Sequence, residues 1–198
     1  MRKLFVAVAA LGMLLTSCAK DESAAGGNAA VVSFNVAQPT IASRVLGTQD
    51  ATEVFGNGFA AEDLEYAIYE AEVDAQGDYF IRDNGLDPIE GVETDFFKGN
   101  ELKNTLEGIR LVRGKHYIAL FFAQSDAVNG NYKFDSATKS ISLKNANALK
   151  AQDESLDAFF ARVDFAISAE AGAQTVDVEL KRPFAQRSEE HTSELQSR

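Results

Sequence analysis

Several short stretches of the chain alternate between apolar and polar residues with a period of two. Val32, Phe34 and Val36 alternate with Ser33 and Asn35, which is the pattern of a strand with one buried face. Comparable strand patterns, about eight in all, recur along the chain at 64–69, 79–81, 106–112, 117–122, 132–134, 140–143, 163–167 and 176–180.

Turn residues join some of these stretches into hairpins. Gln76-Gly77-Asp78 predicts a hairpin over residues 64–82, and Asp135-Ser136-Ala137-Thr138 predicts a second one that joins 132–134 to 140–143. The stretch 117–122 is apolar at every position, so we expect it to be a central strand that is buried on both faces.

One region has a different composition. Residues 145–160 are rich in Ala, Leu, Lys, Gln and Glu, which predicts a short helix near 153–160 on a crossover between strands. Because the remaining elements are short strands with regular turns, the sequence predicts one all-β domain, a β-sandwich, over residues 31–186.

The amino-terminal end has the features of an export signal. Arg2 and Lys3 precede an apolar run over 4–15, which is shorter than the ~20 residues that span a bilayer. Residues 1–17 are therefore interpreted as a secretory signal peptide.

The signal ends in Leu15-Thr16-Ser17-Cys18, which looks like the lipobox of a bacterial lipoprotein. Cys18 is the only cysteine, so it cannot form an internal disulfide, and lipidation is its expected use. One acyl chain binds a membrane only marginally, whereas the two or three chains of such lipoproteins, palmitate among them, would hold the protein firmly.

The residues after Cys18 carry a further signal. Lys20, Asp21 and Glu22 resemble a surface-export signal that directs lipoproteins of Gram-negative gut and oral anaerobes to the outer leaflet of the outer membrane. The alternative is an ordinary charged tether. Residues 23–30 are small and polar, so 18–30 is predicted to be a lipidated cysteine followed by a flexible tether.

The carboxy-terminal residues 187–198 have no apolar periodicity and look like the translation of a common sequencing adapter. The alternative is a genuine polar tail. We expect the native protein to continue past Gln186, with the 31–186 domain as the first of two.

Charge and residue types restrict the function. The net charge is −11 at pH 7, and the sequence has no basic patch with interleaved aromatic residues, which argues against a nucleic-acid partner. His191 lies in the excluded tail, and His116, on a predicted strand, is interpreted as structural. With Cys18 lipidated, no nucleophile–His arrangement can be assembled, so we expect neither an enzyme nor a cofactor.

A set of acidic and amide residues resembles a loose calcium loop but lacks the spacing of a calcium-binding hand motif, so we interpret its members as turn residues and expect no metal. These residues are Asp126, Asn129, Asn131 and Asp135.

Several motifs resemble the fimbrillin-like (Mfa-like) surface lipoproteins. The stretches Val32-Ser33-Phe34-Asn35-Val36 and Tyr66-Ala67-Ile68-Tyr69 match the first part of that family, as does Asp157-Ala158-Phe159-Phe160. The most specific match is Leu180-Lys181-Arg182-Pro183-Phe184-Ala185-Gln186. The resemblance covers roughly 31–186 and implies a transthyretin-like Greek-key β-sandwich in a fimbrium subunit or an accessory tip or anchor component.

The resemblance also implies a route of assembly. In fimbrial relatives a protease cuts after an Arg or Lys behind the first strand, that strand leaves, and a strand from the next subunit replaces it. Arg44 matches the cut position, with an ordinary surface arginine as the alternative. Lys181 and Arg182, next to Pro183, indicate either a domain junction or partner contact, or a structural strand end.

Two further observations leave a second function open. Ser136, in Asp135-Ser136-Ala137, fits a short O-glycosylation pattern of the same bacteria. Tyr66, Tyr69 and Tyr79 cluster in one predicted hairpin, where they are either platforms for sugar or core residues. The alternative to a fimbrial protein is therefore a lipid-anchored module that binds a glycan or host ligand without polymerising.

Overall fold

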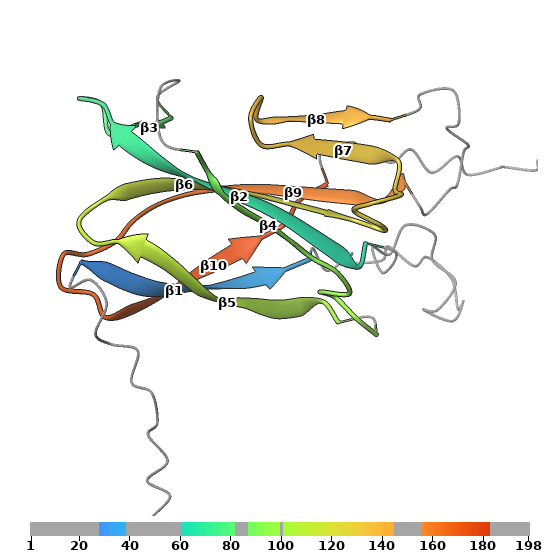
Figure 1. The fold of residues 1–198 in the computed structure, drawn as a ribbon, viewed down its shortest axis with the longest axis horizontal. Helices are drawn as coiled ribbons and strands as arrows, with labels where there is room; N and C mark the ends of the chain where they lie inside the picture. The colour runs from blue at the N-terminus through green and yellow to red at the C-terminus, as the bar shows by residue number, and fades with distance from the viewer. Residues whose placement is uncertain (1–27, 39–60, 82–86, 100, 145–155, 183–198) are drawn as a thin grey trace, which may run out of the picture.

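Ten β-strands run through the described part of the computed structural model, which comprises residues 28–38, 61–81, 87–99, 101–144 and 156–182 (Figure 1). In chain order they are β1 (Ala29–Ala37), β2 (Asp63–Val73), β3 (Tyr79–Phe80), β4 (Ile89–Glu93), β5 (Lys103–Val112), β6 (His116–Gln124), β7 (Tyr132–Asp135), β8 (Ser140–Leu143), β9 (Ala158–Ala166) and β10 (Ala173–Glu179).

The strands form two packed sheets and a separate hairpin. One sheet has the order β10-β1-β5. The other has the order β3-β2-β6-β9, with β4 also paired to β2. Figure 1 shows the three-stranded sheet as the lower layer, the larger sheet above it, and the β7–β8 hairpin over the outer face of the larger sheet. The expected all-β sandwich is therefore confirmed.

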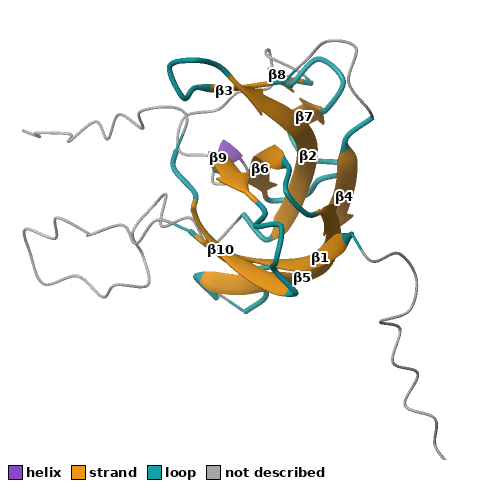
Figure 2. Ribbon diagram, turned by 90° about the vertical axis from the view of Figure 1, so that its left-hand side faces the viewer, coloured by secondary structure: helices purple, strands orange, loops and turns teal. Residues whose placement is uncertain are grey.

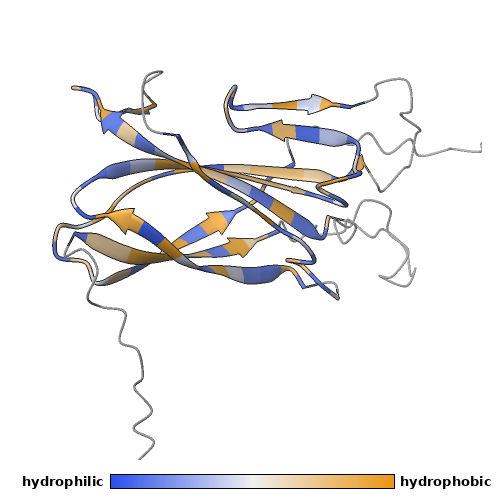
Figure 3. Cartoon of the chain, in the orientation of Figure 1, coloured by the Kyte–Doolittle hydropathy of each residue, from blue (hydrophilic) through white to orange (hydrophobic). Residues whose placement is uncertain are grey.

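The main core lies between the two sheets. Strands of both sheets contribute alternate side chains to one buried apolar cluster. The intervening positions of the three-stranded sheet are mostly exposed, whereas many of those in the larger sheet lie in two smaller clusters on its outer face. The same alternation appears as orange and blue bands along the strands in Figure 3. Phe34 of β1 packs edge-on against Phe121 of β6 and Phe165 of β9, with ring centroids 5.2 Å and 5.5 Å apart.

Strand β6 is central, as its uniformly apolar sequence predicted. It lies between β2 and β9, and every residue from Tyr117 to Gln124 is buried. The outer face is covered because the β7–β8 hairpin packs on it. Phe122 contacts Tyr132 and Phe134 of that hairpin at centroid distances of 5.8 Å and 6.2 Å. Both predicted hairpins are present, β2 with β3 and β7 with β8.

The helix predicted near 153–160 is wrong in its second half. Residues 153–155 lie outside the described residues, and Leu156 alone has 3₁₀-helical conformation. Strand β9 begins at Ala158, inside the predicted helix. Ala158, Phe159 and Phe160 pair with β6, and Phe159 is fully buried. Burial of this aromatic residue in the sandwich overrides the weak helical preference of the surrounding composition.

Two further boundaries differ from expectation. The strand β1 starts at Ala29, within the predicted tether 18–30, because Ala30 is buried in the core. Strand β4 has no counterpart in the sequence prediction, since its residues are mostly exposed and do not alternate in polarity. Within the described ranges, no helix is both long and apolar enough to cross a membrane.

Candidate functional site: the first strand and its surroundings

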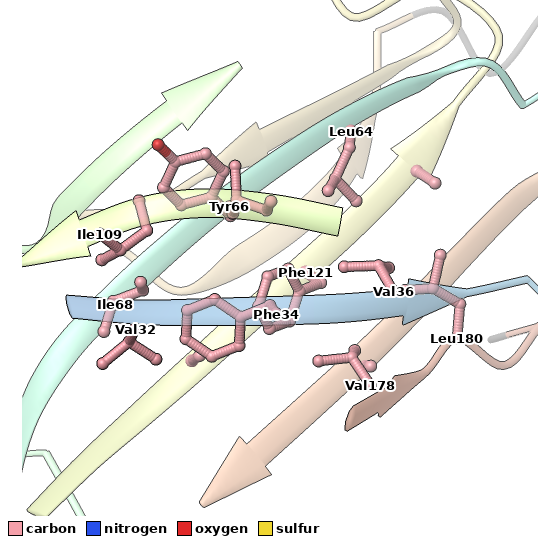
Figure 4. Close-up of a cluster of buried hydrophobic side chains, with 14 of the residues drawn as sticks. Val32, Phe34, Val36, Leu64, Tyr66, Ile68, Ile109, Phe121, Val178 and Leu180 are labelled. Carbon is pink, nitrogen blue, oxygen red and sulfur yellow. The ribbon is translucent and has the colours of Figure 1, made fainter. Parts of the chain in front are cut away.

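The first strand, β1, is built into the core by every second side chain. Ala30, Val32, Phe34 and Val36 have no exposed surface. Figure 4 shows the last three of them in the cluster formed with Phe121 and other core residues. Burying a side chain of the size of Val or Phe contributes about 1.5–3 kcal/mol. The strand is therefore held mainly by its apolar face.

Both edges of β1 are also paired. Along one edge Val31–Ala37 run parallel to β10, and along the other Ala29–Ala37 run antiparallel to β5. The β5 pairing is interrupted by a bulge between Val32 and Phe34, where β5 carries one extra residue. Gly108 in this bulge has φ +79°, a left-handed conformation that glycine adopts without strain. We call β1, its two neighbours and the side chains beneath it the β1 site.

The outer face of the β1 site carries a hydrogen-bonded rung across all three strands. The Asn35 side-chain nitrogen donates to Asp177 of β10 (2.9 Å), and the Thr105 hydroxyl of β5 donates to the Asn35 side-chain oxygen (3.2 Å). The rung is solvent-exposed, so each bond contributes little to stability. It does mark one register of β1, because a slip by one residue would turn Asn35 into the core.

The chain leaves β1 through a buried glutamine. Gln38 follows the strand, and its side-chain nitrogen donates to the carbonyl oxygen of Ala61 (2.6 Å), just before β2. Its backbone nitrogen donates to Leu102 (2.8 Å). These bonds fix the two ends of the segment 39–60, which lies outside the described residues and contains Arg44. No sequence motif around Gln38 indicated that its side chain would hold the two ends of this segment together.

Two of the motifs quoted above meet in space. The segment 180–182, here called the crossing segment, passes from β10 to the larger sheet. The Leu180 nitrogen donates to Ala37 at the end of β1 (2.8 Å). Lys181 exchanges two backbone hydrogen bonds with Phe160 of β9 (2.8 Å and 2.9 Å). The crossing segment therefore links the end of β1, in the three-stranded sheet, to β9 in the larger sheet.

Side chains reinforce this connection. Arg182 forms an ion pair with Asp157 at 3.2 Å, and its guanidinium lies 5.3 Å from the centre of the Phe159 ring. Leu180 is fully buried. These contacts favour the structural interpretation of Leu180, Lys181 and Arg182 as a strand-end motif, while Pro183 and Phe184 lie outside the described residues.

Ser136 lies in the β7–β8 turn, as predicted, but its polar groups are engaged. Its carbonyl oxygen accepts a hydrogen bond from the Tyr69 hydroxyl (2.5 Å), and its own hydroxyl donates to Glu90 of β4. A glycan on Ser136 would displace the bond to Glu90. Glycosylation of Ser136 stays a prediction.

The three tyrosines proposed as sugar platforms are not exposed together. Tyr66 and Tyr69 are buried, on opposite faces of the larger sheet, so both are core residues. Tyr79 is half-buried and packs edge-on against His116, with ring centroids 5.4 Å apart. This contact gives His116 the structural role that was expected of it.

The loose calcium-like set consists of turn residues. Asp126 accepts hydrogen bonds from the backbone nitrogens of Val128 and Asn129, and Asp135 accepts one from Thr138. These backbone donors lower the pKa of Asp126 and of Asp135. Asn131 accepts a backbone bond from Lys144. Across the described ranges, no three His, Cys, Asp or Glu side chains converge in a way that could hold a metal ion.

The remaining predicted site residues lie outside the described part of the chain. They are Cys18, Lys20, Asp21, Glu22 and Arg44. Their predicted roles in lipidation, surface export and proteolytic maturation therefore stay predictions.

Comparison with known proteins yields a distant structural similarity. No protein-family model and no curated protein matches the chain. Among solved structures, it is similar to a fimbrial assembly protein from Parabacteroides distasonis, with a TM-score of 0.39 and 12% sequence identity. The match covers 78% of this chain and 53% of that one, so the chain spans about half the length of the solved structure. Similarity at this level establishes neither a family nor a shared mechanism.

Proposed function

We propose that this protein is a non-catalytic, surface-exposed lipoprotein of the bacterial outer membrane that serves as a fimbrium subunit or as an accessory tip or anchor component. Cys18 carries the lipid anchor, and subunits join by exchange of β1 for a strand of the next subunit. The observation that carries this proposal is the β1 site, in which a terminal strand fills an apolar groove between two neighbours.

The chemistry of the β1 site favours exchange over simple loss of the strand. Removing β1 would uncover the inner side chains of Leu106, Ile109 and Leu111 on β5 and of Val178 on β10, all of which are buried. It would also leave unpaired backbone groups along both β5 and β10. A departing β1 therefore has to be replaced by another extended segment with the same alternation.

Position in the chain favours exchange as well. Among the described residues β1 is the first strand, so its chain connection to the other described strands runs through the segment 39–60. One cleavage in that segment converts β1 from part of the chain into a bound peptide. Arg44 supplies a basic residue in that segment for a trypsin-like protease.

Limited proteolysis tests the cleavage step. Trypsin added to the folded full chain is expected to cut first after Arg44, as detected by mass spectrometry. Arg110 is an internal control, because it is exposed but lies within β5, where the backbone is paired with β1. The Arg44→Gln variant should lose the early cut and keep its fold, as measured by circular dichroism.

Cleavage elsewhere in the folded chain while the Arg44–Val45 bond stays intact would contradict maturation at Arg44. An equal rate of cutting after Arg44 and after Arg110 would mean that the domain unfolds before it is cut.

A further inference from the structure

The strand β4 (Ile89–Glu93) is an open edge of the larger sheet. It pairs with Leu64–Ile68 of β2 on one side, and among the described residues it has no strand on its other side. Figure 2 shows β4 at the right-hand rim of the sandwich. An open edge presents a row of backbone donors and acceptors that can pair with an added strand.

The side chains of β4 favour such an addition but select against a second copy of the chain. Ile89 and Val92 are 42% and 51% exposed, an unusual exposure for β-branched apolar residues on an edge. Glu90 lies between these two residues, and Glu93 is the last residue of the strand. Pairing of two β4 strands would bring four carboxylates together, in a chain whose net charge is already −11.

Acidic hollows lie on both sides of β4. One, of ≈ 480 Å³, separates β4 from the β7–β8 hairpin. Its charged lining residues are Glu65, Glu90, Asp135 and Lys133, and Lys133 is paired with Asp135, which leaves an acidic excess. The other, of ≈ 330 Å³, lies beyond the end of β4 toward β5, and Glu93 and Glu107 line it. Because Glu90 and Glu93 are three residues apart in a strand, they face opposite sides of the sheet, one toward each hollow.

We propose that the free edge of β4 binds an extended, basic segment of a partner protein by strand addition. Basic residues of that segment stand opposite Glu90 and Glu93, and apolar residues stand opposite Ile89 and Val92. In an antiparallel arrangement the segment has the order basic, apolar, any residue, basic, apolar. This interaction is independent of the β1 site, which lies in the other sheet.

A labelled synthetic peptide with the central sequence Lys-Val-Thr-Lys-Ile tests this proposal on the full chain. Fluorescence anisotropy is expected to show saturable binding, and hydrogen exchange at residues 89–93 should slow when the peptide is bound. The double variant E90K/E93K should bind the peptide at least tenfold more weakly. The variant D78K/E170K makes the same charge change at two exposed loop positions outside both β4 and the β1 site, and it should bind within twofold of the unchanged chain.

A second peptide keeps the test independent of how the variants fold. It has the same charges but carries N-methyl groups on the backbone nitrogens, which removes the donors for strand pairing. The proposal expects binding to weaken at least tenfold. Equal binding of both peptides, or equal loss in D78K/E170K, would reduce the interaction to general charge attraction and overturn strand addition. Absence of binding by the first peptide would overturn it as well.

Discussion

Phe34 is the side chain on which the β1 site depends most at the scale of single residues. It has no exposed surface and packs against two aromatic rings, Phe121 and Phe165. Truncation of a buried phenylalanine loses its transfer free energy and leaves a cavity. We predict that Phe34→Ala lowers the free energy of unfolding by about 3–5 kcal/mol, as measured by urea titration.

Val31 supplies the matched control on the same strand. It is 42% exposed and faces the opposite side of the sheet. Val31→Ala is expected to change stability by less than about 0.5 kcal/mol. Similar losses in the two variants would mean that β1 is not anchored through its inner face.

A second prediction at this scale concerns Tyr69, whose hydroxyl donates to the Ser136 carbonyl. Burial, together with the nearby carboxylates of Glu90 and Asp135, raises the pKa of Tyr69 to about 12. The folded pKa is above the unfolded value near 10. The stabilisation by neutral Tyr69 is therefore complete below about pH 10 and is lost as the pH rises through about 12.

We expect Tyr69→Phe to cost about 1 kcal/mol at neutral pH, because one hydrogen bond is lost. Between pH 10 and 12 the unchanged protein should lose stability more steeply than the variant, by about 2 kcal/mol over that range. Thermal unfolding at a series of alkaline pH values measures both quantities. Parallel pH curves for the two proteins would assign the alkaline transition to another group.

The crossing segment 180–182 is the element that ties the two sheets together near the end of β1. Arg182 bonds to Asp157, whose side chain is only 9% exposed, and it also covers the Phe159 ring. Removal of the guanidinium leaves a mostly buried carboxylate without that partner. We predict that Arg182→Ala costs about 1–3 kcal/mol in urea unfolding.

The neighbouring residue separates side-chain from backbone effects. Lys181 is exposed, and its contacts with Phe160 are made by backbone atoms. Lys181→Ala should therefore change stability by less than about 0.5 kcal/mol. A larger loss for Lys181→Ala than for Arg182→Ala would show that the motif does not work through the Asp157 ion pair.

The sequence predicted those elements whose residues carry a strong local pattern. Residues 32–36 alternate, 117–122 are apolar throughout, and both hairpins have recognisable turns, so all of these were found. The strand β4 was missed because Ile89 and Val92 are exposed and Gly91 lies directly against the Tyr66 ring, which interrupts the alternation. Residues 158–160 were assigned to a helix because the pairing partner, β6, is distant in sequence.

At the scale of the whole molecule, the β1 site joins parts of the chain that no local pattern connects. The first strand lies between β5 and the last strand, β10, and it is parallel to β10. The sequence could predict the strand at 32–36 and point to Arg44 behind it, the latter from the family resemblance. It could not predict the Asn35 rung, the Gln38 bond or the meeting of Asp157 with Arg182, because each depends on the sheet order.

The rest of the molecule has apolar contacts that do not involve β1. The outer face of the larger sheet packs against Tyr79 and Ile81 on one side and against the β7–β8 hairpin on the other, in two clusters separate from the main core. Departure of β1 would leave these clusters in place. This separation makes exchange of β1 compatible with a domain that stays folded.

Exchange of β1 can be followed through the uptake of a labelled copy of that strand. The full chain is first cut after Arg44 and then incubated with a fluorescent peptide that spans residues 28–38. Native mass spectrometry follows the peptide into the folded protein. We expect the peptide to replace the original β1 and a Phe34→Ala peptide to enter at least tenfold more slowly, because the buried ring provides much of the binding energy.

A peptide of the same composition in which Ser33 exchanges places with Phe34, and Asn35 with Val36, should not enter, since its Phe and one Val would face away from the core. A cut, folded protein that keeps its own β1 and takes up no peptide would contradict strand exchange. Equal uptake of the native and exchanged peptides would show that the β1 site does not select its strand.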